Sequence, residues 1–229
     1  MRFSGFGPYF EITEYAGSAP DGGGWRPLAE LATDPIALAA RIETVRATLT
    51  PRGGRPVERR PVASAVLLGL AARLLSPALA GAVVAGRLLD LRLARLYWRP
   101  SPSSAFPLAV PADSLPAATD LPAGLADLIS GPIGQLVTTT RAACSLSPLV
   151  AWDNVGSALN GAAIVIGQQR PELADRTYRL TSAVLARPPL GMPDPVAGPS
   201  FRRTSCCLLY RIAGRAAVCA DCVLVPRLA

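Results

Sequence analysis

Apolar residues recur at helical spacing along most of this chain, and short polar or proline-rich segments separate the apolar stretches. In the first stretch, Asp34 and Pro35 have the residue types of an N-cap and a first helical position. Apolar residues then follow three or four positions apart, at Leu38, Ile42, Val45 and Leu49. This pattern predicts a helix that begins at Pro35 and ends before the Thr-Pro-Arg-Gly-Gly sequence at 50–54.

Residues 62–90 are apolar on nearly every side and are long enough to cross a membrane. Arg73 lies near the middle of this stretch, where an arginine costs about 2.5 to 3.5 kcal/mol on insertion into a bilayer. Ser76 and Pro77 form a natural stop and restart for a helix. We therefore predict two helices, at 62–75 and 77–89, that are buried in a soluble core. A peripheral contact with a membrane stays open.

Two β-prone runs, at 93–100 and 105–111, flank a Ser-Pro-Ser-Ser sequence and predict a hairpin or small sheet. Further helices are predicted at 120–130, 131–145, 147–169 and 170–187. The third of these begins with Ser147 as N-cap and Pro148 at the first helical position, and the fourth has a similar start at Pro171. The predicted fold class is mainly α (α+β), a helical domain with a small β element.

A proline-rich segment divides the chain. Residues 188–200 contain five prolines and no periodic apolar pattern, which is typical of an extended linker. We therefore predict a helical domain at 1–187, a linker at 188–200 and a C-terminal module at 201–229. The last of these, called the cysteine module below, contains four of the chain's five cysteines.

Composition excludes several kinds of chemistry. The chain contains neither histidine nor lysine, so its 23 basic residues are all arginine, and its formal net charge is +7. The lack of histidine excludes Ser-His-Asp and Cys-His catalytic groups, His-ligated zinc or haem, and Rieske clusters. The arginines are scattered rather than interleaved with aromatic residues, so we expect no nucleic-acid partner. A metal site here must use thiolates or carboxylates.

The N-terminal residues lack a basic segment followed by the apolar core of a secretory signal, so we expect a cytoplasmic protein that is at most peripherally associated with a membrane. In that reducing compartment, clustered cysteines indicate a metal site or redox chemistry more often than disulfides. Cys206 and Cys207 are adjacent, eleven residues separate them from Cys219, and two residues separate Cys219 from Cys222.

This spacing allows structural zinc, an iron-sulfur cluster or a catalytic dithiol. Zinc ribbons pair two Cys-x-x-Cys turns, and only Cys219 and Cys222 form one. Adjacent cysteines in extended chain point to opposite faces, so a single small ion would require a local turn, whereas a two-iron cluster offers two metal atoms. A redox Cys-x-x-Cys is expected beside a βαβ pattern, which the sequence does not show. The spacing favours an iron-sulfur cluster and leaves zinc open.

The sequence FRRTSCCLLYRIAGRAAVCADCVL, at 201–224, resembles the C-terminal pattern of the FhuF-like ferric-siderophore reductases. That pattern has two adjacent cysteines, ten residues and then Cys-x-x-Cys. The matching positions are Arg202, Arg203, Cys206, Cys207, Tyr210, Arg211, Cys219, Asp221 and Cys222. Residues 63–80 and 147–159 resemble the family's apolar helix pair and its Trp-x-Asn helix. This chain has eleven residues where the pattern has ten, and we expect the extra one to be accommodated at Gly214.

The resemblance implies a function and a cofactor. It implies that the four clustered cysteines ligate a 2Fe-2S cluster, which passes one electron to the ferric ion of a siderophore and so releases ferrous iron. It requires no catalytic side chain beyond the cluster. The partners would be the ferric siderophore and an external electron donor of the ferredoxin or flavin reductase type. Arg202, Arg203, Tyr210 and Arg211 would surround the cluster or contact the substrate. The alternative is a zinc-stabilised structural or interaction module without redox activity.

Other residues allow a structural or a functional interpretation. Arg73 could pair with a buried carboxylate or face a ligand, and Trp152, Asp153 and Asn154 could belong to the core or lie beside the cluster. Cys144, far from the other cysteines, is typical of a small buried apolar residue. The cysteine module also carries more arginine than acid, at positions 202, 203, 211, 215 and 227 against Asp221 alone. That excess predicts a raised reduction potential and attraction of anionic ferric complexes.

Overall fold

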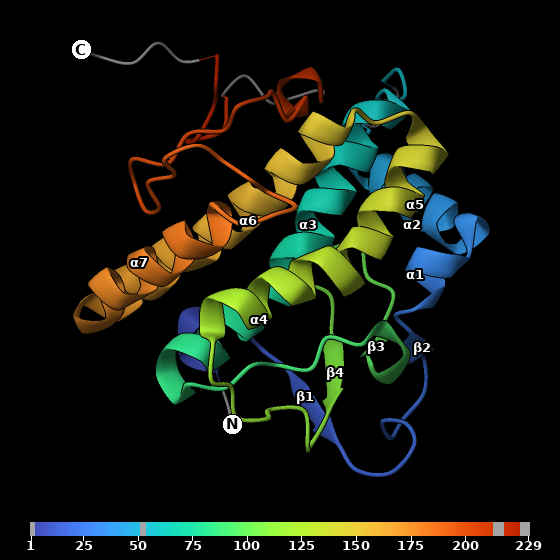
Figure 1. The fold of residues 1–229 in the computed structure, drawn as a ribbon. Helices are drawn as coiled ribbons and strands as arrows, with labels where there is room; N and C mark the ends of the chain where they lie inside the picture. The colour runs from blue at the N-terminus through green and yellow to red at the C-terminus, as the bar shows by residue number, and fades with distance from the viewer. Residues whose placement is uncertain (1–2, 51–53, 213–217, 225–229) are drawn as a thin grey trace.

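Two long helices, packed side by side, form the centre of the molecule. The computed structural model describes residues 3–50, 54–212 and 218–224. Its central helices are α3 (Arg59–Ala80) and α6 (Pro148–Gln169), which make the most extensive contact between any two described elements. In Figure 1 they cross the middle of the fold, with the small sheet at one end and the C-terminal residues beside α6. This arrangement confirms the predicted mainly α fold.

Shorter helices surround the central pair. They are α1 (Glu30–Thr33), α2 (Pro35–Leu49), α4 (Leu121–Leu128), α5 (Gly134–Cys144) and α7 (Ala174–Leu185). Helix α2 packs against α3, and α7 packs against α6. A π-helical turn, Ile129–Ile133, joins α4 to α5, and a 3₁₀ turn, Pro171–Leu173, leads into α7. Helices α4, α5 and α7 and these two turns lie within the helical stretches that the sequence predicts after residue 119.

The helix starts follow the predicted chemistry in part. The Asp34 side chain accepts a hydrogen bond from the backbone N–H of Ile36 at 2.8 Å, and Pro35 is the first residue of α2, which confirms that N-cap. Ser147 occupies the N-cap position of α6 before Pro148, but its side chain makes no capping hydrogen bond. Proline at the first position costs α6 no hydrogen bond, because that N–H has no partner within a helix.

The prediction of two separate helices at 62–75 and 77–89 is wrong. Helix α3 continues through Pro77 and ends in a π-helical turn, Gly81–Ala85. Nearly every residue of α3 from Pro61 onward is buried, so the apolar packing of the whole segment outweighs the local cost of proline. By length and composition, Arg59–Ala85 and Pro148–Gln169 could each cross a membrane, but 89% of the most apolar window of the first is buried inside the protein.

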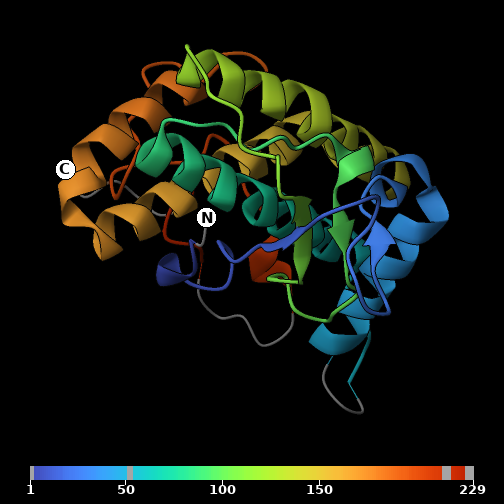
Figure 2. The same cartoon turned by 90° about the horizontal axis from the view of Figure 1, so that it is seen from below.

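A small mixed sheet covers one end of the helices. Its strands, in spatial order, are β1 (Thr13–Tyr15), β4 (Leu108–Pro111), β3 (Tyr97–Trp98) and β2 (Arg26–Pro27). β1 and β4 are parallel, and the other pairs are antiparallel. Strands β3 and β4 confirm the predicted β runs, whereas β1 and β2 were not predicted because each is short and pairs with residues 70 or more positions away in the sequence. Figure 2 shows the sheet on one side of the helices.

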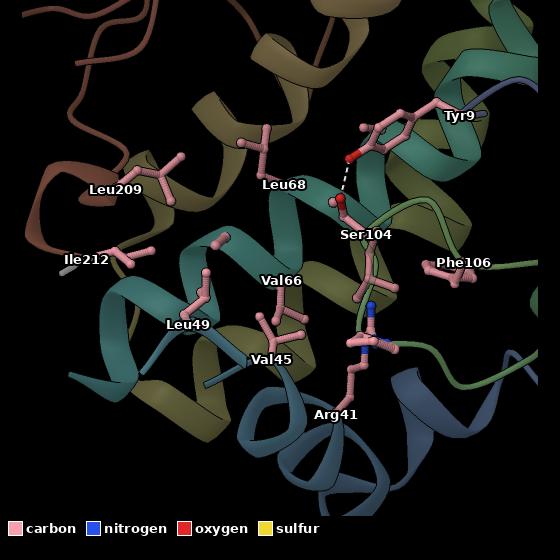
Figure 3. Close-up of a pocket in the computed structure, with 15 residues that line it drawn as sticks. Tyr9, Arg41, Val45, Leu49, Val66, Leu68, Ser104, Phe106, Leu209 and Ile212 are labelled. Atoms are coloured by element: carbon pink, nitrogen blue, oxygen red, sulfur yellow. Dashed lines mark hydrogen bonds between the residues drawn. The ribbon is translucent and has the colours of Figure 1, made fainter. Parts of the chain in front are cut away.

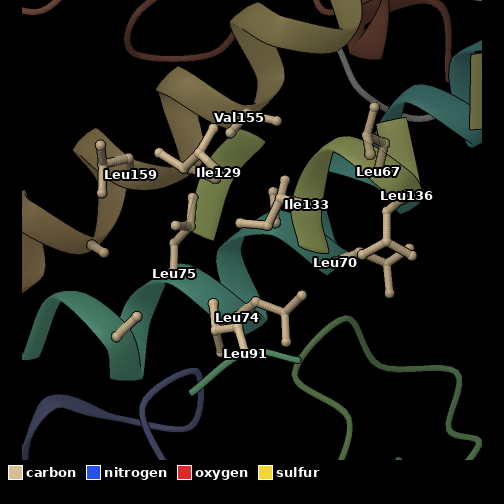
Figure 4. Close-up of a cluster of buried hydrophobic side chains, with 14 of the residues drawn as sticks. Leu67, Leu70, Leu74, Leu75, Leu91, Ile129, Ile133, Leu136, Val155 and Leu159 are labelled. Atoms are coloured by element: carbon tan, nitrogen blue, oxygen red, sulfur yellow. The ribbon is translucent and has the colours of Figure 1, made fainter. Parts of the chain in front are cut away.

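The core lies where α3, α5 and α6 meet. Figure 4 shows leucines of α3 in one cluster with Ile129, Ile133 and Leu136 and with Val155 and Leu159 of α6, while Leu74 lies beside Leu91. All of these side chains are almost completely buried. Truncation of one such leucine to alanine typically costs about 2 to 5 kcal/mol of stability. The core therefore depends on apolar packing from segments far apart in the sequence.

Arg73, in the middle of α3, connects this core to the N-terminal residues. Its guanidinium is buried and donates to the backbone carbonyls of Tyr9, Glu11 and Phe106, rather than pairing with a carboxylate side chain as one interpretation expected. Burial lowers the pKa of Arg73 to about 10, so the side chain is still charged at neutral pH. The three carbonyls compensate the buried charge and fix residues 9–11 and 106 against α3.

Candidate iron-sulfur centre

Residues 187–200 return the chain from α7 to the middle of α6. This segment has no helix or strand in the described structure, yet specific hydrogen bonds hold it. Asn160 of α6 accepts from the N–H of Gly198 at 2.6 Å and donates to its carbonyl at 3.1 Å. The Ser182 hydroxyl accepts from the N–H of Ala197 at 3.0 Å. The cysteine module therefore begins beside the middle of α6, and Figure 1 shows the C-terminal residues along this helix. The domain boundaries at 187 and 200 stay a prediction.

Asp153 of α6 holds the residues that precede the first two cysteines. Its carboxylate accepts from the Thr204 hydroxyl at 3.0 Å and from the backbone N–H of Ser205. Asp153 is buried, and hydrogen bonds from these donors compensate the loss of water around its charge. Because Ser205 directly precedes Cys206, this contact fixes where the adjacent cysteines enter the site.

Asn154, the next residue of α6, connects the cysteine module to both central helices. Its side-chain oxygen accepts from Arg203 Nη2 at 2.5 Å, and its Nδ2 donates to the Ser64 hydroxyl of α3 at 2.8 Å. The Ser64 hydroxyl in turn donates to the carbonyl of Cys207 at 2.7 Å. Asn154, Arg203, Ser64 and Cys207 are all buried, so each bond lies where an unpaired polar group would be costly.

Asp221 holds the second pair of cysteines in the same way. Its carboxylate accepts from the Ser157 hydroxyl of α6 at 2.5 Å and lies 3.9 Å from Arg203 Nε. Its backbone carbonyl accepts from the N–H of Arg203 at 3.1 Å, which joins the two cysteine-bearing segments. A turn closed by the N–H of Cys222 and the carbonyl of Cys219 presents that pair. Helix α6 thus positions all four cysteines.

The sulfur atoms are arranged as free thiols, without a disulfide. Cys207 Sγ lies 3.5 Å from Cys219 Sγ, so the two segments bring one sulfur each into contact. Cys206 Sγ accepts from the N–H of Leu208, and Cys222 Sγ accepts from the N–H of Leu224, both at 3.4 Å. Leu208 has a left-handed backbone (φ 65°), which provides the turn that two adjacent cysteines require.

The described structure brings together one sulfur from each pair of cysteines, Cys207 and Cys219. Within residues 3–50, 54–212 and 218–224, no three or more His, Cys, Asp or Glu side chains converge closely enough to hold one metal ion. A 2Fe-2S cluster takes four thiolates, two on each iron, and N–H donors to sulfur stabilise its charge. The described structure shows the contact between Cys207 and Cys219 and the two N–H donors to Cys206 and Cys222, but it does not bring all four sulfurs together.

Burial raises the pKa of the Cys219 thiol, and the hydrogen bond with Cys207 and the negative charge of Asp221 raise it further. A metal cluster binds thiolates, so loading of the site must release protons. We therefore expect cluster assembly to become more favourable as the pH rises.

The other predicted residues have separate positions. Exposed Arg202 donates to the carbonyl of Ala220, within the Cys219–Cys222 turn, at 3.2 Å. Arg211 pairs with Glu58 at the start of α3 at 2.7 Å, and Tyr210 is half exposed. Cys144 ends α5, where burial raises the pKa of its thiol. Gly214, Arg215 and Arg227 lie outside the described residues.

Sequence reasoning missed two residues that hold the module, Ser64 and Ser157. Both are small hydroxyl residues on otherwise apolar helix faces, and that signal is weak because serine is common on helices. Asp153 and Asn154 were recognised as ambiguous, and the structure shows that they bind the module's backbone and side chains. Trp152 is partly buried and packs against the core, which agrees with the structural interpretation of that residue.

Comparison with known proteins agrees with this geometry. No curated protein matches the chain. Residues 203–224 match the family model of the FhuF 2Fe-2S C-terminal domain, and all four clustered cysteines lie within the match. The match favours an iron-sulfur cluster over structural zinc. The chain therefore carries a FhuF-type 2Fe-2S C-terminal domain, and the cofactor of that domain is a 2Fe-2S cluster.

Proposed function

We propose that this protein is a ferric-siderophore reductase. The observation that carries the proposal is the match of residues 203–224 to the FhuF 2Fe-2S domain, with its four cysteines held on a defined scaffold. When bound, the 2Fe-2S cluster supplies a one-electron donor. Cys206, Cys207, Cys219 and Cys222 would hold it. The substrate is the ferric ion of a siderophore complex, and the products are ferrous iron and the freed siderophore.

The chemistry explains why one electron is sufficient. Siderophores hold ferric iron through hard oxygen donors, which bind the smaller, more highly charged ferric ion far more strongly than ferrous iron. Addition of one electron therefore weakens the complex without any acid, base or nucleophile from the protein. A chain without histidine is compatible with such a reaction. The electron would come from an external donor of the ferredoxin or flavin reductase type, in the cytoplasm.

The residues of this chain would position the site and set its charge. Asp153, Asn154 and Ser157 hold the two cysteine segments at α6. Exposed Arg202 adds positive charge beside the Cys219–Cys222 turn, where it would favour the more negative, reduced state and attract anionic complexes. Arg203 is buried beside Asp221, so much of its charge is already compensated within the module.

Anaerobic reoxidation tests the proposal. The chemically reduced protein should be reoxidised by a ferric siderophore, and a ferrous-specific chelator should trap iron in proportion to the electrons lost. Cys144→Ser is the matched control, since it removes a thiol outside the cysteine module and should react as the wild type does. Reoxidation by oxygen, with no response to hydroxamate, catecholate or carboxylate ferric complexes, would contradict the proposed activity.

Metal analysis separates the cofactor from the activity. We expect about two iron and two sulfide per chain in anaerobically prepared protein, as a 2Fe-2S centre requires. About one zinc per chain without sulfide would support the zinc-stabilised alternative instead. If the protein contains the cluster but does not reduce ferric siderophores, the cofactor assignment holds and the proposed activity is wrong.

A further inference from the structure

A cavity of about 250 Å³ lies where the cysteine module meets the helical core. Its walls come from α2, from the face of α3 around Gly69, from the loop at 102–106 and from the 3₁₀ turn Leu209–Arg211 of the module. Figure 3 shows Leu209 and Ile212 on one side and Arg41, Ser104 and Phe106 on another. The cavity is called the Arg41 pocket below.

Arg41 is the unusual residue of this pocket. It is only 5% exposed, and it makes no ion pair with any carboxylate in the described part of the chain. Its terminal nitrogens donate to the carbonyls of Ser101 and Ser103, while the buried Nε–H has no hydrogen-bond partner. Burial lowers the pKa of Arg41, as expected for a cation that lacks a counter-charge.

The buried Arg73 is a useful comparison, because its guanidinium group is fully hydrogen-bonded whereas that of Arg41 is not. Arg73 donates all three kinds of guanidinium nitrogen to backbone carbonyls, so each nitrogen has a partner. Arg41 is also buried but has one donor without an acceptor, and the aromatic rings of Trp98 and Phe106 lie 5.8 and 5.7 Å from its Cζ. A buried cation with an unpaired donor is costly unless a ligand completes its interactions.

The remaining walls define what such a ligand must be. The hydroxyls of Tyr9 and Ser104 contact each other at the edge of the pocket, and the other side chains are mostly aliphatic: Val45, Leu49, Val66, Leu68, Leu209 and Ile212. Guanidinium groups match carboxylates in shape and charge, whereas aliphatic walls favour an apolar body over an inorganic ion. The cavity volume, about 250 Å³, is below the roughly 300 to 1,000 Å³ of pockets that hold drug-sized ligands, so the ligand must be small.

We propose that the Arg41 pocket binds a small organic carboxylate, with the carboxylate at Arg41 and a short aromatic or branched apolar body between α2, α3 and the cysteine module. Leu209 and Ile212 line the pocket and follow Cys207 by two and five residues. A ligand in this pocket would contact the module directly at Leu209. Leu209 lies two residues after Cys207, a chain length of at most roughly 7 Å. Ligand binding is measured without turnover, so the proposal stands independently of the proposed reductase activity.

Paired probes isolate the role of charge. We would titrate the cluster-loaded protein with benzoate and with benzamide, which have nearly the same shape, and detect binding by ligand-observed nuclear magnetic resonance. Benzoate should bind at least about tenfold more tightly than benzamide, because only benzoate supplies a negative charge to Arg41. Equal affinities, or no binding of either probe at millimolar concentration, would overturn the proposal.

Variants locate the binding. Arg41→Gln should abolish the preference for benzoate, whereas Arg46→Gln, a change on the same helix outside the pocket, should leave it intact. If Arg41→Gln fails to fold, Ala65→Phe fills the pocket from α3 without touching Arg41 and should weaken benzoate binding at least about tenfold. Benzoate binding that survives Ala65→Phe would place the probe elsewhere and overturn the assignment.

Competition identifies the source of the carboxylate. A ferric complex whose ligand bears a free carboxylate is added at saturation, and benzoate binding is measured again. Displacement of benzoate would show that the pocket receives a carboxylate arm of a ferric chelate. Simultaneous binding would assign the pocket to a free organic acid. Both results presuppose the Arg41-dependent site, which the variants above test.

Discussion

The α3–α6 core and the cysteine module are held together by different interactions. The core buries a continuous set of leucine, isoleucine and valine side chains from α3, α5 and α6. The module contributes few such side chains, and its cysteine segments are held by hydrogen bonds to Asp153, Asn154 and Ser157. Apolar packing needs no cofactor, whereas the module depends on a few polar contacts and on what its thiols bind. A substitution should therefore be able to destabilise the core without releasing the metal, or release the metal without unfolding the core.

The largest effect is expected from removal of a thiolate. Serine at position 206, 207, 219 or 222 should abolish or distort the cluster, with loss of the red-brown colour, because we propose that each cysteine supplies one of the four sulfur donors that the centre needs. Far-ultraviolet circular dichroism should change little, since the helical core lies elsewhere. Cys144→Ser should retain the full visible spectrum. A bleached Cys144→Ser together with a coloured variant at one of the other four positions would contradict the ligand assignment.

A substitution in the core should lower the stability of the fold and leave the binding of iron unchanged. Leu74→Ala removes a fully buried side chain of α3 and should lower the free energy of unfolding by about 2 to 5 kcal/mol. Chemical denaturation followed by circular dichroism measures that loss. The rate at which a chelator removes iron from the folded protein should stay near the wild-type value. If Leu74→Ala also accelerates iron loss, by a factor that matches its loss of stability, the two regions unfold as one unit.

Asn154→Ala should act on the module. It removes the acceptor of Arg203 Nη2 and the donor to the Ser64 hydroxyl, both buried, at a cost of about 1 to 3 kcal/mol, and we expect iron to be lost to a chelator several-fold faster. Gln168→Ala is a matched control, since it removes an exposed amide from the same helix. If iron loss is unchanged in Asn154→Ala, the hydrogen bonds to α6 do not hold the cysteine segments.

The smallest effect concerns surface charge. Arg202→Gln should lower the reduction potential by tens of millivolts, a fraction of the ~59 mV that corresponds to a tenfold change for one electron. It should also slow reaction with anionic ferric complexes at low salt. Arg211→Gln is the control, since Arg211 is paired with exposed Glu58. Protein-film voltammetry measures the potential of each variant, and the rate of anaerobic reoxidation at low salt measures the reaction with anionic complexes. An unchanged potential in Arg202→Gln would mean that Arg202 acts only through its hydrogen bond with Ala220.

The sequence predicted features that depend on local pattern. Asp34 and Pro35 mark a helix start that the structure confirms, and the four clustered cysteines are read directly from their spacing. Pro77 shows the limit of local rules, because burial of the whole of α3 decides that helix. Strands β1 and β2 depend on partners more than 70 residues away, so no local pattern could reveal them. Arg41 became notable only when the structure showed which of its nitrogens has no acceptor.

The chain of hydrogen bonds from Arg203 through Asn154 and Ser64 to the Cys207 carbonyl has a consequence for protein engineering. It uses side chains from two helices whose positions depend on the entire apolar core. A synthetic peptide that copies residues 201–229 would include all four clustered cysteines and none of these helix residues. Transplantation of the cluster-binding site to another scaffold would therefore have to reproduce a pair of packed helices with serine and asparagine at matching heights.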